Sequence, residues 1–349
     1  MGIFALERDH REGSDVEDVL ARARGLVDPV LRAAVDTLPV SLRRIAAYHF
    51  GWSEADGRPA AGPAGKAIRP ALVLAATRAL GGDPATAVRA AAAVELVHNF
   101  TLLHDDVIDG DDTRRHRLTA WRVFGTTEAI LAGDALHSLA LRLLAEDGHP
   151  AAREAGRRLA DCVVELCAGQ QADCAFEQRG DVSLAECLAM AEAKTGALLG
   201  CACAVGALYA GADEEAAQAM DAFGREIGLA FQLIDDLIGI WGDPAVTGKP
   251  VGADLAARKK SLPVVAALAA DGAEGAVLAS LYGLDRPLTE EELARCARAV
   301  EAAGGRAWAQ GESCERMATA IGHLAEAVPE PAAADDLLAL AELVTRRSH

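Results

Sequence analysis

Apolar residues recur at intervals of three and four positions along most of this chain, which is the spacing of a helix with one buried face. No segment alternates apolar and polar residues as a half-buried strand does. The pattern therefore predicts an all-α protein. The expected helices, in chain order, cover 14–37, 39–51, 70–80, 85–109, 126–148, 151–178, 184–210, 213–241, 261–270, 274–282, 289–303, 305–326 and 331–346.

Local start and stop signals agree with these ranges. Three helices begin with the spacing of a capping box, in which Ser or Thr precedes Glu by three positions: Ser14–Glu17, Ser183–Glu186 and Thr289–Glu292. Segments 51–65 and 242–254 are rich in Gly and Pro and are predicted to be loops. Because no linker separates the helices, we expect residues 1–13 to be a loose leader and residues 14–349 to form a single helical domain.

Composition narrows the class of protein. Of the 349 residues, 51% are hydrophobic and only 4% aromatic, so Ala and Leu, which are strong helix formers, supply much of the core. The net charge of −18, without a long basic run, argues against a nucleic-acid partner. The eight cysteines form no CxxC pair, and we expect them to be small core residues in a reducing cytosol. Short or interrupted apolar stretches and an early-charged N-terminus predict a cytoplasmic protein without stable membrane insertion.

Two clusters of carboxylates follow apolar helical segments. Asp105 and Asp109 are four residues apart and share one helix face, where like charges destabilise the helix unless a cation compensates. Asp235 and Asp236 follow a second apolar segment. Carboxylate oxygens without His or Cys suit Mg²⁺, which shares its ligand shell with substrate phosphates. We therefore expect two clusters that face each other across a cavity; the alternative is a solvated acidic helix end.

Basic residues flank both clusters, although the protein is strongly acidic. They are Lys66 and Arg69, Arg114 and Arg115, Lys194, and Lys249 and Lys259. Any single one could form a surface ion pair. Their repeated placement beside the acidic segments favours a ligand with phosphate groups. There are more cations than one diphosphate needs, which indicates two diphosphate sites, one metal-bound and one bound by Arg and Lys.

The chain resembles the trans-isoprenyl diphosphate synthases, or polyprenyl synthetases, over residues 60–270. The elements that carry the resemblance, in the family's order, are Gly65-Lys66-Ala67-Ile68-Arg69-Pro70, Asp105-Asp106-Val107-Ile108-Asp109 with Arg114-Arg115, Gly169-Gln170 with Asp173, Lys194-Thr195, Phe231-Gln232 with Asp235-Asp236, and Gly248-Lys249. The resemblance implies an isoprenoid-synthase-type helical bundle around a central active-site cavity. It also implies three Mg²⁺ ions per active site and a homodimer.

The resemblance further implies a role for each matching residue. Asp105, Asp109 and Asp235 would bind the Mg²⁺ ions that hold an allylic diphosphate (dimethylallyl, geranyl or farnesyl), and Asp106 and Asp236 would support that site electrostatically. Residues implied to contact this diphosphate or to line the reacting centre are Arg114, Lys194, Lys249, Lys259, Thr195 and Gln232. Residues implied to bind isopentenyl diphosphate are Lys66, Arg69, His98 and Arg115, although His98 could instead be a hydrogen-bonded core residue.

Three positions depart from the family pattern. Gly239 replaces the last Asp of the second motif, with Asp243 one further turn along. His116 stands where the family usually has Gly, and Leu118 where it usually has Pro. We expect the loss at position 239 to be tolerated, because the family places the third metal on the first Asp of that motif.

The product is expected to be the C20 compound, geranylgeranyl diphosphate. The growing tail should extend from Asp105 toward the N-terminus of its helix, where one turn rises about 5.4 Å. Thr101 lies one turn before Asp105, Phe100 lies beside it, and Val97 is a turn further. In the family, two aromatic residues at the fourth and fifth positions before the first Asp favour C15, and here only Phe100 is aromatic. The alternative is that Phe100 is ordinary core packing.

Other activities stay open at this point. A farnesyl or a longer-chain synthase would share every motif. A class I terpene cyclase shares the fold and the first aspartate motif, but it has little use for the second basic site at Lys66, Arg69 and Arg115. A catalytically silent helical subunit that regulates a partner would not need intact aspartate motifs.

Overall fold

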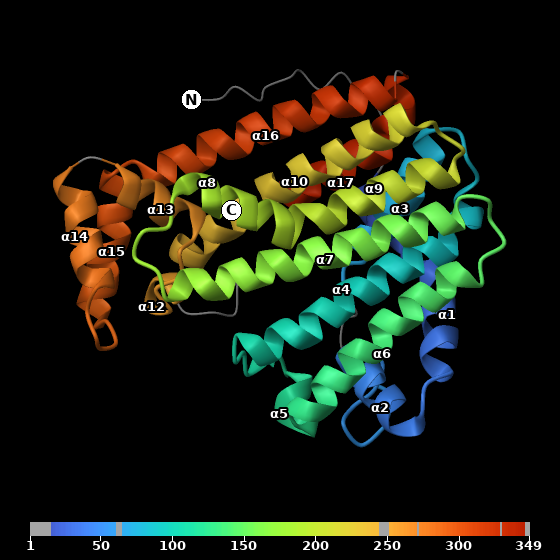
Figure 1. The fold of residues 1–349 in the computed structure, drawn as a ribbon, viewed down its shortest axis with the longest axis horizontal. Coiled ribbons are helices and arrows are strands. Elements are labelled where there is room, and N and C mark those ends of the chain that lie inside the picture. Colours follow the sequence, from blue (N-terminus) through green and yellow to red (C-terminus); the bar gives the residue numbers. More distant parts are fainter. Residues whose placement is uncertain (1–14, 61–64, 244–250, 271, 329, 346–349) are drawn as a thin grey trace.

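The computed structural model describes residues 15–60, 65–243, 251–270, 272–328 and 330–345, and helices make up most of this part of the chain (Figure 1). The helices of the first half are α1 (Val16–Asp36), α2 (Val40–His49), α3 (Ile68–Ala79), η1 (Pro84–Ala87), α4 (Val88–Ile108), α5 (Ala120–Phe124), α6 (Thr126–Ala145) and α7 (Ala152–Glu177). The second half contributes α8 (Leu184–Ala191), η2 (Glu192–Gly196), α9 (Ala197–Tyr209), α10 (Glu214–Trp241), α12 (Ala253–Ala256), α13 (Leu262–Ala269), α14 (Ala273–Tyr282), α15 (Glu290–Ala302), α16 (Gly305–Ala327), η3 (Pro331–Ala334) and α17 (Asp335–Thr345). The all-α prediction is confirmed.

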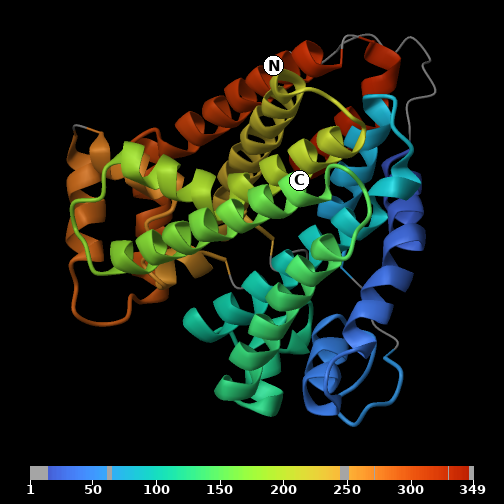
Figure 2. The ribbon, with the colours of Figure 1, turned by 45° about the vertical axis from the view of Figure 1, so that its right-hand side comes forward.

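The centre of the bundle is built from α3, α4, α9 and α10. Helix α9 contacts α3, α7 and α10 and has almost every residue buried. Its Ala, Gly and Cys side chains are small, which lets neighbouring helix backbones approach closely. Helix α16 packs along α10, and α6 packs along α4. Figure 2 shows α1 beside α3 and α4, on the side away from α16.

A smaller group of helices lies at one end of the bundle, where α14 and α15 pack against each other and against α13 (Figure 1). A separate apolar cluster holds these helices to the end of α10, and it includes Ile240, Leu255, Val264, Leu278 and Val300. The last turns of α10 are anchored in this cluster through Ile240 and Trp241, close to the aspartates of the same helix.

Two predicted capping boxes are confirmed and one is not. The side chains of Ser183 and Thr289 each accept a hydrogen bond from the backbone N–H three residues on. The carboxylate of the partner Glu accepts one from the backbone N–H of the Ser or Thr. The first helix begins instead at Val16, with Asp15 as its cap. Ser14 and the predicted leader 1–13 lie outside the described residues.

Four further expectations need correction. Residues 113–118 form a two-stranded hairpin, β1 (Thr113–Arg114) and β2 (Arg117–Leu118), too short for the periodicity to reveal. The predicted helix 184–210 is interrupted by a π-helical turn, η2. The helix expected at Pro70 begins at Ile68. The predicted loop 242–254 ends in the first residues of a short helix, α12.

The cysteine prediction is confirmed only in part. Five of the eight are buried, at positions 162, 187, 201, 203 and 296, whereas Cys167 and Cys314 are exposed and Cys174 is half-buried. The apolar stretch Leu184–Tyr209 is long and apolar enough to cross a membrane by length and composition. Because 67% of its most apolar window is buried inside the protein, it has the character of a core helix in a soluble protein.

Candidate active site

The first aspartate cluster lies at the C-terminal end of α4. Asp105 is half-buried in the last turn, and Asp109 is the exposed C-cap, whose backbone N–H donates to the Asp105 carbonyl. Burial raises the pKa of Asp105 to about 6; Lys194 opposes the shift and the charge of Asp109 adds to it. Burial also raises the pKa of Asp109. Burial disfavours the charged form of both carboxylates, and a cation shared between them would stabilise both charges.

Asp106, between them in sequence, has a different environment. It is 1% exposed, and its Oδ1 accepts a hydrogen bond from Arg114 Nε at 2.6 Å. The Arg114 side chain, predicted to contact a diphosphate, is thus tied to the back of the cluster through Asp106. Through this hydrogen bond Asp106 holds the hairpin that follows α4.

The second cluster repeats this arrangement on α10. Asp235 is exposed, whereas Asp236 is 3% exposed. Asp236 accepts hydrogen bonds from Gln232 Nε2 and from the Leu262 backbone N–H, both at 2.8 Å. Lys259 Nζ lies 3.7 Å from its Oδ1. The buried aspartate therefore fastens the start of α13 to α10, while its neighbour Asp235 is left at the surface of the site.

Gln232 and Thr195 are brought together, as predicted for residues lining one centre. Thr195 Oγ1 donates to Gln232 Oε1 at 2.8 Å, and the Gln232 amide in turn donates to Asp236. Both hydrogen bonds fix which way the amide group faces. Thr195 lies in the π-helical turn η2, and such turns often occur at functional sites because they redirect side chains.

Lys194, in the same turn, lies close to the first cluster. Its Nζ forms a 2.5 Å ion pair with Asp173 on α7. Its charge partly offsets the rise that burial causes in the pKa values of Asp105 and Asp109. Helix α7 can approach this turn because residue 169 is Gly: a Cβ there would lie 2.6 Å from the Lys194 backbone nitrogen. This close approach places the segment Gly169–Asp173 of α7 beside Lys194.

Lys259 joins the clusters electrostatically. Burial acts to lower its pKa, but the carboxylates of Asp236, Asp254, Asp173 and Asp235 outweigh burial, so the pKa of Lys259 is raised. The same lysine acts on Asp109 of the first cluster. Lys259 thus interacts with both Asp109 on α4 and Asp235 on α10, two helices that are far apart in the sequence. This supports the expectation that the clusters face one site.

The donor atoms of the two clusters suit some metal ions better than others. Among the described residues, no three His, Cys, Asp or Glu side chains converge closely enough to bind a metal on their own. A closed protein cage suits Zn²⁺ or Ca²⁺, whereas Mg²⁺ keeps several waters and bridges one or two carboxylates to phosphate oxygens. The separated, accessible carboxylates of Asp105, Asp109 and Asp235 fit Mg²⁺ bound together with a diphosphate.

A second basic group gathers around the start of α3. Arg69 Nη1 lies 3.1 Å from His98 Nε2, and burial with the nearby arginines holds the pKa of His98 well below its usual value. His98 is therefore neutral and accepts from Arg69. Lys66 is exposed, and the Arg115 guanidinium reaches the backbone of Gly65. Three of the predicted residues, Arg69, His98 and Arg115, are thus brought together near the start of α3. Lys249 lies outside the described residues.

Glu95 is a member of this group that the sequence analysis missed. It is 7% exposed on α4, and its carboxylate interacts with both Arg69 and Arg115. Asn99 Nδ2 also donates to Glu95 Oε1 at 3.0 Å. A buried acid between two arginines holds both side chains in place. The signal was available, since Glu95 lies three residues before His98 in an otherwise apolar run.

The hairpin between the two basic groups has an unusual backbone. Arg115 and His116 form its two-residue turn, with φ angles of 51° and 62°. Positive φ at both central residues is typical of type I′ turns, which favour Gly, Asn and Asp. The family's Gly at position 116 suits this turn, and His116 adopts it at a conformational cost. Leu118 is exposed, and its carbonyl accepts from the Tyr48 hydroxyl.

A cavity of about 460 Å³ extends from the first cluster along α4 and α7. It is mostly apolar, and its wall includes Phe100, Thr101, Asp105, Leu166, Cys167, Gln170 and Lys194. The Phe100 ring contacts His104 and His137, with centroids 4.8 and 5.2 Å apart. Val97 is fully buried in the core and does not belong to the lining. The wall nearest the predicted end of the tail is thus Phe100 backed by His137.

Gly239 departs from the family motif for a structural reason. A Cβ at this position would lie 2.3 Å from Asp254 Oδ2, so the Asp254 carboxylate occupies the space that a side chain at 239 would need. Asp254 belongs to α12, and its charge acts on Lys259 together with Asp235 and Asp236. The second cluster therefore has a third carboxylate, supplied by another helix. Sequence spacing alone gave no sign of it.

Comparisons with known proteins agree on one relationship. The polyprenyl synthetase family model matches residues 57–300. The chain is 50% identical over 331 residues to a geranylgeranyl diphosphate synthase of Mycobacterium tuberculosis, covering 94% of this chain and 93% of that protein. It is 47% identical over 321 residues to a (2E,6E)-farnesyl diphosphate synthase of the same organism, covering 91% and 89%. A crystal structure of polyprenyl synthetase from Streptomyces coelicolor superposes with a TM-score of 0.90 at 48% identity, covering 95% and 99%.

Proposed function

The chain belongs to the polyprenyl synthetase family, and on this basis we propose that it condenses isopentenyl diphosphate with an allylic diphosphate to form a linear prenyl diphosphate. The observation that carries the proposal is the division of basic residues into two groups. Lys194 and Lys259 act on the aspartate clusters, whereas Arg69, His98 and Arg115 are gathered around Glu95 near the start of α3. Two groups suit two diphosphates.

The metal-dependent site would bind the allylic diphosphate. We propose that Asp105, Asp109 and Asp235 hold three Mg²⁺ ions with this substrate. When bound, such ions stabilise negative charge on a departing diphosphate. Lys194 and Lys259, with Lys249 and Arg114, would add fixed positive charge around the same group. Asp106 and Asp236 hold Arg114 and Lys259 in position.

The reaction then follows from charge and position. The bond between the allylic carbon and the diphosphate breaks, and the electron pair leaves with the diphosphate. Isopentenyl diphosphate, held by Lys66, Arg69, His98 and Arg115, attacks the allylic cation through its double bond, and a new C–C bond forms. Loss of one proton to the departing diphosphate regenerates an allylic product one isoprene unit longer. Thr195 and Gln232 line this centre, and their fixed dipoles favour the cation.

We propose geranylgeranyl diphosphate, the C20 compound, as the main product. Relatives named for C20 and for C15 products have nearly equal identity, so the argument depends on the cavity wall. Thr101 lines the cavity and is small, and Phe100 is braced by His137. Phe100→Ala should shift the products toward C25 or longer, and Thr101→Phe should shorten them to C15. If both active variants keep the wild-type product pattern, the end of the cavity is set elsewhere.

Two properties complete the proposal. A cytoplasmic location suits a protein with eight free cysteines and a buried apolar helix. A homodimer is expected from the family. Sedimentation equilibrium of the purified protein would test the dimer, with a monomer at micromolar concentration as the contrary result.

A further inference from the structure

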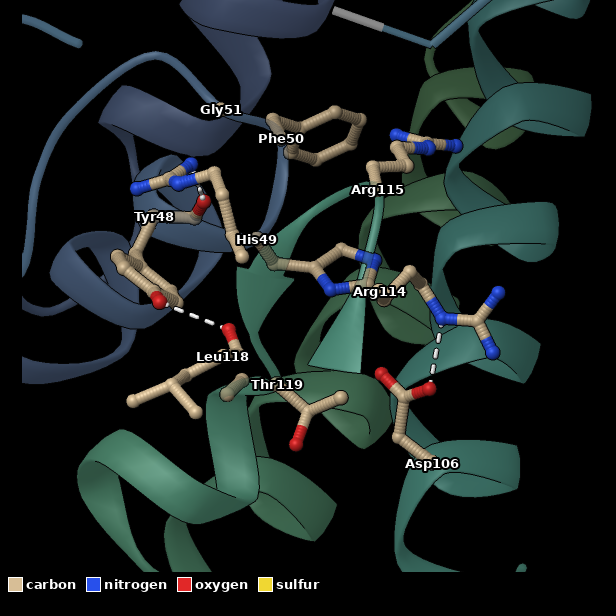
Figure 3. A pocket seen from close by; sticks show the side chains of 11 residues that line it. Tyr48, His49, Phe50, Gly51, Asp106, Arg114, Arg115, Leu118 and Thr119 are labelled. Carbon is tan, nitrogen blue, oxygen red and sulfur yellow. Dashed lines mark hydrogen bonds and ion pairs between the residues drawn. The ribbon is translucent and has the colours of Figure 1, made fainter. Parts of the chain in front are cut away.

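A small cavity with both polar and apolar walls lies behind the arginine hairpin, apart from the substrate cavity. It has a volume of about 30 Å³ and lies between the end of α2, the end of α4 and the hairpin β1–β2 (Figure 3). Its wall includes His49, Asp106, Arg114 and Arg115. About 10–15 Å³ is enough for one water molecule, provided that polar partners surround it.

Two buried polar atoms of this wall lack a hydrogen-bond partner among the described residues. They are Asp106 Oδ2 and His49 Nε2. Asp106 Oδ1 already accepts from Arg114, so only its second oxygen is unsatisfied. Buried carboxylate oxygens and ring nitrogens are nearly always hydrogen-bonded, to protein or to ordered water. Both atoms belong to side chains that line the same cavity.

The protonation of His49 decides what it needs from a partner. Burial, and then the charges of Arg115 and Arg114, lower the pKa of His49 to about 3. The ring is therefore neutral, with one N–H and one lone pair, and Nε2 either donates or accepts a hydrogen bond, according to the tautomer.

We propose that this cavity binds one ordered water molecule, which hydrogen-bonds to His49 Nε2 and donates to Asp106 Oδ2, and that His49 is a positioning residue for the arginine hairpin. Water can donate to the carboxylate and can either donate to or accept from the imidazole nitrogen, and it is the smallest molecule that fits. A cation is disfavoured because Arg114 and Arg115 already surround the cavity.

The position of His49 gives this site a consequence for the reaction, which rests on the proposed function. Figure 3 shows the imidazole between Arg115 and the Asp106–Arg114 pair. Arg114 is held toward the metal-dependent site by Asp106, and Arg115 toward the second diphosphate site by Glu95. The uncharged ring separates two like charges at a turn with positive φ at Arg115 and His116. Removing the ring's polar anchor should loosen both arginines together.

The test compares His49→Phe, which keeps a flat ring without polar atoms, with His49→Gln, which keeps an acceptor for the water. His323→Phe on α16 is the matched control, since it changes the same residue type far from the hairpin. Crystal structures near 1.5 Å resolution would show the water directly. Steady-state kinetics would give KM for isopentenyl diphosphate and for farnesyl diphosphate separately.

We expect the water in the wild type and in His49→Gln, and its loss in His49→Phe. His49→Phe should raise both KM values about tenfold, the effect of one lost hydrogen bond to a charged group, with a smaller change in kcat. His49→Gln should recover most of this, and His323→Phe should match the wild type. A dry cavity in the wild type, or wild-type KM values in His49→Phe, would overturn the proposal. If His49→Phe does not fold, the wild-type and His49→Gln structures still decide it. A wild type that binds the water but condenses nothing would instead refute the proposed function.

Discussion

The two aspartate clusters, one on α4 and one on α10, are built on the same plan with one difference. In each, the first aspartate faces the site and the second is buried against a cation, with 1% of Asp106 and 3% of Asp236 exposed. In the first cluster the third carboxylate, Asp109, comes four residues later on the same helix. In the second it comes from Asp254 on α12, which fills the space beside Gly239. The same charge pattern is thus reached by local spacing in one cluster and by tertiary packing in the other.

Each aspartate motif thus contains two kinds of residue, an accessible aspartate and a buried one. Under the proposed function the accessible aspartates bind the metal ions, and the buried ones hold neighbouring side chains in place. Arg114 and Lys259 depend on their buried partners for their positions. Substitutions in matching positions of the two clusters should therefore have matching effects, except at the third carboxylate.

The largest effect is expected at the accessible aspartates. Asp105→Asn and Asp235→Asn should each lower kcat by about a thousandfold or more, because about 4 kcal/mol of transition-state stabilisation is lost. Neither should lower the melting temperature, since both side chains are at least partly exposed. The measurement is incorporation of labelled isopentenyl diphosphate at saturating Mg²⁺. Turnover near the wild-type rate in either variant would contradict the equivalence of the two clusters.

The buried aspartates should show the opposite behaviour. Asp236→Ala leaves the Leu262 N–H and the Gln232 amide without their acceptor, and Lys259 without its nearest carboxylate. We expect a loss of about 3 kcal/mol in the free energy of unfolding, measured with urea. Asp106→Ala should behave similarly through Arg114. Asp235→Ala serves as the control, and a similar loss there would remove the distinction between accessible and buried positions.

The third carboxylate offers the sharpest comparison within one cluster. Gly239→Asp restores the family motif but places a side chain against Asp254, so we expect kcat to fall about tenfold to a hundredfold, or 1.4 to 2.8 kcal/mol. The double variant Gly239→Asp with Asp254→Gly moves the carboxylate to α10 and should recover most of the activity. A double variant no better than the single one would show that Asp254 does more than supply charge.

The smallest expected effect is on the pH dependence of stability. In the metal-free protein burial raises the pKa of Asp105 to about 6, above the ordinary value near 3.8. The folded state therefore binds this proton more tightly than the unfolded state, so the contribution of Asp105 to the free energy of unfolding falls as pH rises from about 4 to 6 and is level above. Asp105→Asn should reduce this pH-dependent change in the free energy of unfolding by an amount on the order of 1 kcal/mol. Urea titrations between pH 4.5 and 7 would show it, and identical slopes would contradict the assigned environment of Asp105.

Much of the fold was predictable because helix period and caps are local signals. The capping boxes at Ser183 and Thr289 and the ends of α4 and α10 followed from residues a few positions apart. The π-helical turn around Lys194 was not predictable in this way, because it depends on contact with Gly169 of α7. The hairpin at Arg115 and His116 escaped notice because two-residue strands have no periodicity.

The residues of the site show the same difference between local and tertiary signals. Motif spacing brought the pairs Asp105–Asp109, Thr195–Gln232 and Arg69–His98 into consideration, and the last two pairs are in direct contact. Glu95, Asp254 and His49 were missed. Each acts through tertiary neighbours: Glu95 through two arginines, Asp254 through Gly239, and His49 through the hairpin. Side chains whose partners lie on other elements leave little trace in a single sequence.

One measurement tests the proposed function most directly. The purified protein, with Mg²⁺, is incubated with labelled isopentenyl diphosphate and farnesyl diphosphate, and the products are identified by chromatography before and after phosphatase treatment. We predict one linear product, geranylgeranyl diphosphate, whose formation stops when a chelator removes Mg²⁺. Release of diphosphate with a cyclic hydrocarbon, or no incorporation of label with any allylic primer, would contradict a condensing enzyme with two diphosphate sites.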